Sequence, residues 1–211
     1  MKKQTHHRSL VQSGFTLVEL LVVITIIAIL ASLAIPVTNA VMKNANTLRI
    51  KATMKDLQVA IGHYRTEYNR FPVAISGASG GKDIDPILTN GTNSIITVLM
   101  AATGPDANST MNRRNIKFID LPFAKNLTSF GVVDPSGGSG GADLKLVDIW
   151  GQPYTIYLDT NYDNRITNPD ATNVDKRISS KATKHLSSST GIQSRGPDKI
   201  LNTKDDIVSW R

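Results

Sequence analysis

Glu19 carries the charge in this chain that most needs a chemical explanation. It is the only charged residue of an apolar run that extends from Phe15 to Pro36. An ionised acid near the centre of a membrane-length helix costs roughly 2.5 to 3.5 kcal/mol, so its presence points to a partner of opposite charge. Cleavage after Gly14 would create an amine four residues away from Glu19. The pattern therefore suggests a processed N-terminus whose new amine pairs with this acid.

The apolar run itself has two simpler interpretations. At about 22 residues it is long enough to cross a hydrocarbon core of about 30 Å as a helix. A cleavable secretory signal is one alternative, because the segment 31–34 has the small residues of a cleavage site. A plain signal anchor is the other, with Lys2, Lys3 and Arg8 as its cytoplasmic charges. Neither alternative explains why Glu19 lies inside the run.

A second chemical pattern occupies the segment 159–170. Oxygen-bearing side chains recur at alternate positions, as the first half of a calcium loop requires, and an aspartate falls at the twelfth position. The residues that would bind are Asp159, Asn161, Asp163 and Asp170. Because a predicted strand precedes the loop, the site would be a strand-loop variant without flanking helices. The alternative is a polar turn rich in Asn and Asp.

No arrangement of residues supports catalysis. The chain has no cysteine, which excludes thiolate metal sites and disulfides. His63 and His185 are isolated, and His6 and His7 lie in the basic leader that cleavage would remove. The sequence contains no HExxH motif, phosphate-binding glycine loop or nucleophile elbow. We therefore predict that the protein is not an enzyme.

Composition limits the number of domains and the class of partner. At 211 residues, the chain has room for one modest soluble domain after the leader and the apolar run. Its net charge is +7, but the basic residues form no consecutive block. Since nucleic-acid surfaces cluster their charge on one face, we expect no nucleic-acid partner.

The elements that position these residues begin with one long helix. Downstream of the run 15–36, the segment 37–72 continues as an amphipathic helix, with a kink predicted at Pro36 and an end near Pro72. Apolar residues of this segment recur at spacings dominated by three, four and seven, and we predict that they pack on a sheet. They are Val41, Leu48, Met54, Leu57, Ile61, Tyr64 and Tyr68.

The rest of the chain divides into a loop-rich region, 73–142, and a small antiparallel sheet with acidic loops, 143–211. In the first region we expect a short helix within 94–102, loops at 73–82 and 135–141, and an extended segment at 118–123 that packs on the main helix. In the second we expect strands at 144–149, 154–158 and 207–210, and another around 191–194. The fold class is therefore α+β, with the long helix laid across the sheet.

The segment 14–20 (GFTLVEL), together with the basic leader before it, resembles the class III signal of type IV pilins and type II secretion pseudopilins. The resemblance implies that a prepilin peptidase cuts between Gly14 and Phe15 and removes the leader 1–14. It further implies N-methylation of Phe15 and neutralisation by Glu19 of the amine of a neighbouring subunit. The implied architecture is a type IV pilin-like fold whose segment 15–36 serves first as a transmembrane helix and then as the filament core.

Two C-terminal segments also resemble the major pseudopilin of type II secretion. The segment 148–154 (DIWGQPY) is similar to its DPWGNPY stretch, and 194–207 is similar to its C-terminal calcium loop. The resemblance implies Ser194, Asp198, Asp205 and Asp206 as calcium ligands, although Lys199 replaces the expected glycine. A cation there would crosslink the tail to the body and supply stability.

The sequence thus predicts the precursor of a pseudopilin of a type II secretion system, which helps to export folded proteins. Its precursor would lie in the bacterial inner membrane, N-terminus in the cytoplasm and globular domain in the periplasm, before joining a pseudopilus or surface filament. The implied partners are the peptidase and methyltransferase, copies of itself, other pseudopilins, an inner-membrane assembly platform and lipid. One alternative is a type IV pilus subunit for adhesion, motility or DNA uptake. Another is a membrane-anchored calcium-binding domain that does not polymerise.

Overall fold

The computed structural model describes residues 14–73, 81–102, 111–126, 129–135, 143–173 and 183–211. The chain divides into two compact units, Met1–Ala45 and Asn46–Arg211. The division falls within the helix α1, which extends over Leu17–Tyr68. Apart from Gly14, the predicted leader 1–14 lies outside the described residues.

The first unit contributes the N-terminal part of α1. The helix continues through Pro36, where the sequence predicts a kink. The hydroxyls of Thr25 and Ser32 donate to the carbonyls of Leu21 and Ile29, each at 2.7 Å, so both polar groups are satisfied within the helix. No helix in the part of the chain that the structure describes is long and apolar enough to cross a membrane.

The second unit buries one face of α1. The helix ends at Tyr68, and Asn69 follows with a φ of 53°, so the chain leaves the helix slightly before the predicted end. The prediction that Leu48 packs on the sheet is wrong, because this residue is 68% exposed, while Val41 lies in the first unit and is 59% exposed. The buried face begins farther along, and its members are Ile50, Thr53, Met54, Leu57, Ala60, Ile61 and Tyr64.

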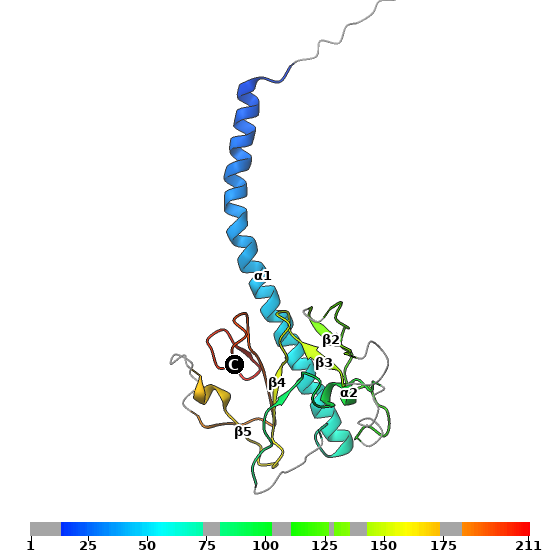
Figure 1. Cartoon of the computed structure of the whole chain (residues 1–211). Helices are drawn as coiled ribbons and strands as arrows, with labels where there is room; N and C mark the ends of the chain where they lie inside the picture. The colour runs from blue at the N-terminus through cyan, green and yellow to red at the C-terminus, as the bar shows by residue number, and fades with distance from the viewer. Residues whose placement is uncertain (1–13, 74–80, 103–110, 127–128, 136–142, 174–182) are drawn as a thin grey trace, which may run out of the picture. The chain divides into compact units, whose positions relative to one another are not determined.

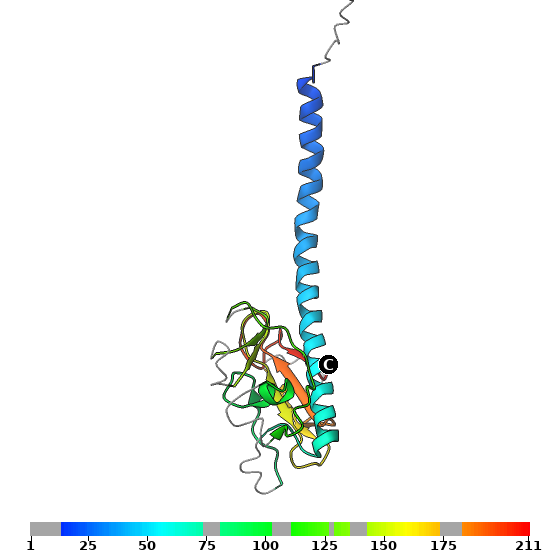
Figure 2. The same cartoon turned by 90° about the vertical axis from the view of Figure 1, so that its right-hand side faces the viewer.

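A four-stranded antiparallel sheet packs beside this part of α1 (Figures 1 and 2). Its order is β1 (Ile87–Leu88), β4 (Thr155–Leu158), β7 (Thr190–Ser194) and β8 (Ile207–Val208). Ile156 of β4 lies opposite Ile192 of β7, and both are fully buried in the core shared with α1. The predicted α+β class, with a long helix on a small antiparallel sheet, is confirmed.

Two smaller ladders complete the strands. β2 (Gly131–Val133) pairs with β3 (Lys145–Val147), and β5 (Ile166–Thr167) pairs with β6 (His185–Leu186). The strands β3, β4, β7 and β8 fall where the sequence predicts them, and α2 (Ile95–Leu99) lies within the predicted short helix. The 3₁₀ helix η1 (Pro169–Thr172) was not predicted, nor were β1, β2, β5 and β6.

The segment 118–123 packs on α1 through Phe118, as predicted, and forms an isolated bridge at Phe123. The ring of Phe118 meets the ring of Tyr64 edge-on at a centroid distance of 5.3 Å and that of Tyr68 at 6.1 Å. The buried hydroxyl of Tyr64 donates to the carbonyl of Met111 at 2.8 Å. These contacts bind the loop-rich region to the helix and close one end of the core.

Candidate functional site

The predicted cleavage bond lies just ahead of α1. Gly14, Phe15 and Thr16 are outside regular secondary structure, and Phe15 is 77% exposed. A Cβ on Gly14 would meet no atom within 4 Å. The bond between Gly14 and Phe15 is therefore open to an enzyme in the described structure.

Glu19 closes the first turn of α1 through a capping box with Thr16. The amide of Thr16 donates to Oε2 of Glu19 at 2.8 Å, and the Thr16 hydroxyl donates to the same oxygen at 2.7 Å. In return, the amide of Glu19 donates to the Thr16 hydroxyl at 3.2 Å. Two amide groups that a helix leaves without partners are thus satisfied. The acid predicted to act in assembly also fixes where the helix begins.

The apolar side chains on either side of Glu19 in the sequence point outward on all sides of the helix. Each is between 45% and 80% exposed within the first unit. They are Leu17, Val18, Leu20, Leu21, Val22, Val23, Ile24, Ile26, Ile27, Ile29 and Leu30. A contiguous apolar surface of this kind marks a site that another molecule or a lipid phase covers.

The acidic loop after β4 is organised by the backbone of the loop itself. Both carboxylate oxygens of Asp159 accept hydrogen bonds from backbone amides: Oδ1 from Asp163 at 2.9 Å and Oδ2 from Asn164 at 3.0 Å. Oδ1 of Asn161 accepts the same Asp163 amide at 3.0 Å, and Oδ1 of Asp163 accepts the amide of Arg165 at 2.9 Å. Asn164 has a φ of 62°, in the left-handed region that asparagine tolerates. The side-chain oxygens of Asp159, Asn161 and Asp163 thus accept hydrogen bonds from backbone amides of the loop.

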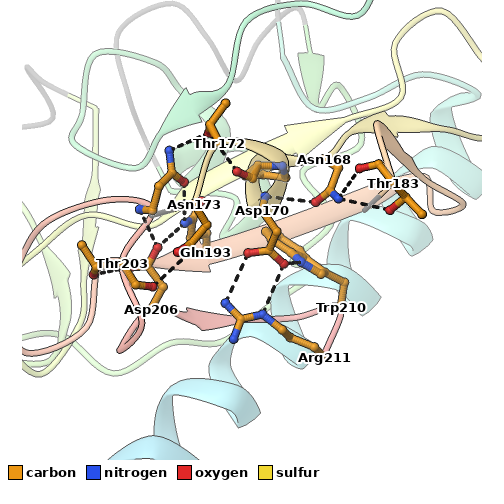
Figure 3. A network of polar contacts seen from close by, with 12 residues as sticks. Asn168, Asp170, Thr172, Asn173, Thr183, Gln193, Thr203, Asp206, Trp210 and Arg211 are labelled. Carbon is orange, nitrogen blue, oxygen red and sulfur yellow. Dashed lines mark hydrogen bonds and ion pairs between the residues drawn. The ribbon is translucent and has the colours of Figure 1, made fainter. Parts of the chain in front are cut away.

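Asp170, predicted for the twelfth position of that loop, accepts hydrogen bonds from the C-terminal residues. It is fully buried at the start of η1, where Oδ2 accepts the indole N–H of Trp210 at 2.7 Å. Both of its oxygens also accept from the guanidinium of Arg211, each at 3.2 Å. Asp170 is therefore the buried anion of an ion pair with the partly exposed Arg211, and Figure 3 draws the contacts between them.

The structure brings together the acids of the second predicted loop, between β7 and β8. The amide of Asp198 donates to Oδ2 of Asp205 at 3.1 Å. Oδ2 of Asp206 accepts from the side chain of Gln193 at 2.5 Å and from the amide of Asn202 at 2.7 Å. Burial raises the pKa of Asp206, while these hydrogen bonds act against the rise. In this loop too, the carboxylate oxygens accept hydrogen bonds from amides of the protein.

Ser194, the fourth residue predicted for this loop, faces another buried acid. Its hydroxyl donates to Oδ2 of Asp148 at 2.7 Å. Oδ1 of Asp148 accepts the amides of Trp150 and Gln152, each at 2.9 Å, and so shapes the turn within the segment 148–154. Burial raises the pKa of Asp148, against the effect of these hydrogen bonds. No local pattern indicates the bond between Ser194 and Asp148, because the two residues lie 46 positions apart.

In both loops, backbone amides donate to side-chain oxygens that would be calcium ligands. Across the described ranges, no group of three or more acidic, histidine or cysteine side chains is placed to hold a metal ion. Calcium binding by either loop stays a prediction.

Comparison with known proteins bears on the N-terminal part of the chain. Residues 10–35 match the family model of the prokaryotic N-terminal methylation motif. The chain is 39% identical over 72 residues to the competence protein ComGC of Halalkalibacterium halodurans, a stretch that covers 34% of this chain and 67% of that protein. No solved structure matches the chain.

Two further relatives have names that indicate other roles. The fimbrial protein EcpC of Eikenella corrodens is 31% identical over 101 residues, which are 44% of this chain and 66% of that protein. The type II secretion system core protein G of Aeromonas hydrophila is 38% identical over 66 residues, which are 31% of this chain and 46% of that protein. The chain thus spans about two thirds of the first two relatives and less than half of the third.

The matched motif contains the residues that the geometry singles out, Gly14, Phe15 and Glu19, and the helix and sheet arrangement agrees with the fold predicted from them. The chain belongs to the type IV pilin-like family, which includes pilins and the pseudopilins of type II secretion.

Proposed function

We propose that this protein is the precursor of a helical filament subunit, a pseudopilin of a type II secretion system that helps to export folded proteins. The observation that carries the proposal is the N-terminal arrangement. An accessible bond between Gly14 and Phe15 leads directly into a capped helix whose apolar side chains are uncovered. The relatives bear the names of secretion, fimbrial and competence components.

The proposed processing step converts the capped helix start into a pairing site. A prepilin peptidase hydrolyses the peptide bond after Gly14, and the new amine of Phe15 is then N-methylated. The amine remains a cation after methylation, so it can pair with a carboxylate. Glu19 is the acid nearest to it in sequence, and a charge pair is tolerated among packed apolar helices where a lone charge is not.

The uncovered apolar surface of α1 supports both stages of the proposal. Before assembly, lipid of the inner membrane covers it, with the N-terminus in the cytoplasm and the second unit in the periplasm. After assembly, the helices of neighbouring copies cover it instead. Other pseudopilins and an inner-membrane assembly platform complete the partners. Because subunits join by a repeated heterologous contact, the product is an open helical filament.

The test changes only the charge of Glu19. Glu19→Gln keeps the capping box, since glutamine can accept the same bonds from Thr16, but it removes the anion. We expect normal cleavage, judged by the mass of the mature N-terminus beginning at methylated Phe15, and loss of filaments. Assembly is measured by crosslinking between cysteines introduced into this cysteine-free chain.

Glu67→Gln is the matched control, because it makes the same change near the other end of α1. It should leave both processing and crosslinking intact. Filaments formed equally well by the Glu19→Gln protein would refute the pairing argument. A mature N-terminus near Ala34 would instead identify an ordinary secretory signal.

A type IV pilus subunit is the second candidate function. The similarity to the fimbrial protein favours it, because that match extends over more of this chain than the match to the secretion protein. Deletion of the gene separates the two candidates. Loss of secreted proteins supports the pseudopilus, whereas loss of twitching, adhesion or transformation with normal secretion supports the pilus.

A further inference from the structure

We infer that the C-terminal segment 207–211 is held in place by side chains of the chain itself, centred on Asp170, and that this hold needs no divalent cation. We call Asp170, Trp210 and Arg211 the Asp170 staple. The inference goes beyond the filament role, because it concerns what stabilises the isolated subunit. It also departs from the expectation that calcium fastens the tail.

The staple joins a buried anion to two donors from the tail. The side chain of Asp170 is 1% exposed and that of Arg211 is 30% exposed, so the pair lies at the border of the core. The guanidinium binds with two nitrogens, Nε and Nη2, and the indole of Trp210 adds a third bond (Figure 3). Bidentate contacts between arginine and a carboxylate are among the strong hydrogen bonds of proteins.

The sheet is shaped to receive the tail. A Cβ on Gly191 of β7 would lie 2.5 Å from Cδ1 of Ile166 and 3.2 Å from Cζ3 of Trp210, so the missing side chain makes room for the indole. Tyr157 of β4 meets the Trp210 ring edge-on at a centroid distance of 6.0 Å. The indole of Trp210 is thus held by packing against β4 and β7 as well as by its hydrogen bond to Asp170, and both fix its orientation.

The same 3₁₀ helix that carries Asp170 also holds the loop between β7 and β8. Thr172 accepts the side-chain amide of Asn202 at 3.2 Å, and the side-chain amide of Asn173 donates to the carbonyl of Thr203 at 3.1 Å. A calcium ion would tether this loop through oxygen ligands. Here neutral amides of the chain make the tether, and η1 fastens both the loop and the tail.

The tail is also tied to α1 within the second unit. The side-chain amide of Gln58 donates to the hydroxyl of Ser209 at 3.2 Å and to the carbonyl of Thr190 at 3.0 Å. The ammonium of Lys51 lies 3.4 Å from the carbonyl oxygen of Arg211. The tail therefore connects η1, the sheet and the helix. If the proposed filament role holds, subunits keep this connection when divalent cations are scarce.

The experiment uses the full chain in detergent and measures the environment of the C-terminal segment by the fluorescence of Trp210. The chain has two tryptophans, so Trp150→Phe leaves Trp210 as the only indole reporter. In that background, we expect EDTA to change neither the emission maximum of Trp210 nor the melting temperature. Asp170→Asn should shift the emission to the red and lower the melting temperature by several degrees, because the partly exposed guanidinium of Arg211 loses its buried anion.

A second variant and a control keep the test decisive if Asp170→Asn does not fold. Arg211→Gln removes the more exposed partner and should give the same red shift with a smaller loss of stability. Asp120→Asn, at an acid whose side chain is 81% exposed, should change neither quantity. The inference is overturned if EDTA alone exposes Trp210, or if both staple variants leave the emission unchanged. Since the subunit is measured in isolation, failure to form filaments in cells has no bearing on this result.

Discussion

Replacing Asp148 by asparagine or by alanine should give very different stabilities. The carboxylate accepts three hydrogen bonds in a fully buried site, from the amides of Trp150 and Gln152 and from the hydroxyl of Ser194. Asparagine keeps two of these bonds, because its oxygen can accept both amides, and it reverses the third, because its NH₂ can donate to the Ser194 oxygen. Alanine leaves three donors without acceptors, and each unsatisfied buried group costs about 1 to 3 kcal/mol.

The expected loss for Asp148→Ala is therefore about 4 kcal/mol, a large part of the 5 to 15 kcal/mol that is typical of a folded domain. For Asp148→Asn we expect a change within about 1 kcal/mol at pH 7. The assay is urea unfolding of the full chain in detergent, followed by tryptophan fluorescence. If asparagine costs as much as alanine, the site needs the negative charge itself, and the reasoning from hydrogen bonds is refuted.

The pH dependence of the same variant gives an independent check. Burial raises the pKa of Asp148 in the folded protein, so the folded state holds the proton more tightly than the unfolded chain. Its contribution to stability is complete below the ordinary aspartate pKa of about 3.9 and is lost as pH rises through the raised value. Asp148→Asn should therefore gain stability relative to the unaltered protein between pH 4 and pH 7. Asp206, whose pKa burial also raises, contributes to the pH dependence with the same sign.

Two further predictions concern local backbone structure. Gly196→Ala should lower the melting temperature by several degrees, because its φ is +68° and a Cβ would lie 2.4 Å from the carbonyl oxygen of Asp205. Gly62→Ala is the control, since its Cβ would meet nothing within 4 Å and alanine should stabilise this exposed helical position by about 1 kcal/mol. Thr16→Ala should cost the first turn of α1 about 1 kcal/mol, seen as faster amide exchange at Glu19 and Leu20, and unchanged exchange there would contradict the capping box.

The sequence predicts α1 well because its signal is local and long. The apolar run and the spacing that follows it identify nearly the whole helix, and Thr16 and Glu19 stand at the spacing of a capping box that could have been recognised. The packing face is harder to place. Periodicity shows which side of a helix is apolar, but Leu48 is exposed because it lies about 200° around the helix from Ile50, which begins the buried face.

Some strands could be located from the sequence and others could not. β4 is rich in residues that favour strands, and β4 and β7 could both be located within one or two positions. β1 and β5 contain only two residues each, and their existence depends on partners far along the chain. The Asp170 staple was missed for the same reason, because nothing near residue 170 indicates that its partners lie 40 and 41 positions away. Spacing within 159–170 pointed instead to a metal loop.

Asp148 and Asp170 together show that the donors around a buried acid decide whether its charge matters. Both carboxylates are fully buried and both link the sheet to distant segments. The donors at Asp148 are neutral amides and a hydroxyl, and a neutral asparagine can form hydrogen bonds with all of these groups. Those at Asp170 include the guanidinium of Arg211, which stays charged and needs an anion in a poorly solvated site. The same substitution, aspartate to asparagine, should therefore be nearly silent at residue 148 and strongly destabilising at residue 170. Equal effects at the two positions would mean that burial alone, and not the chemistry of the partners, sets the cost.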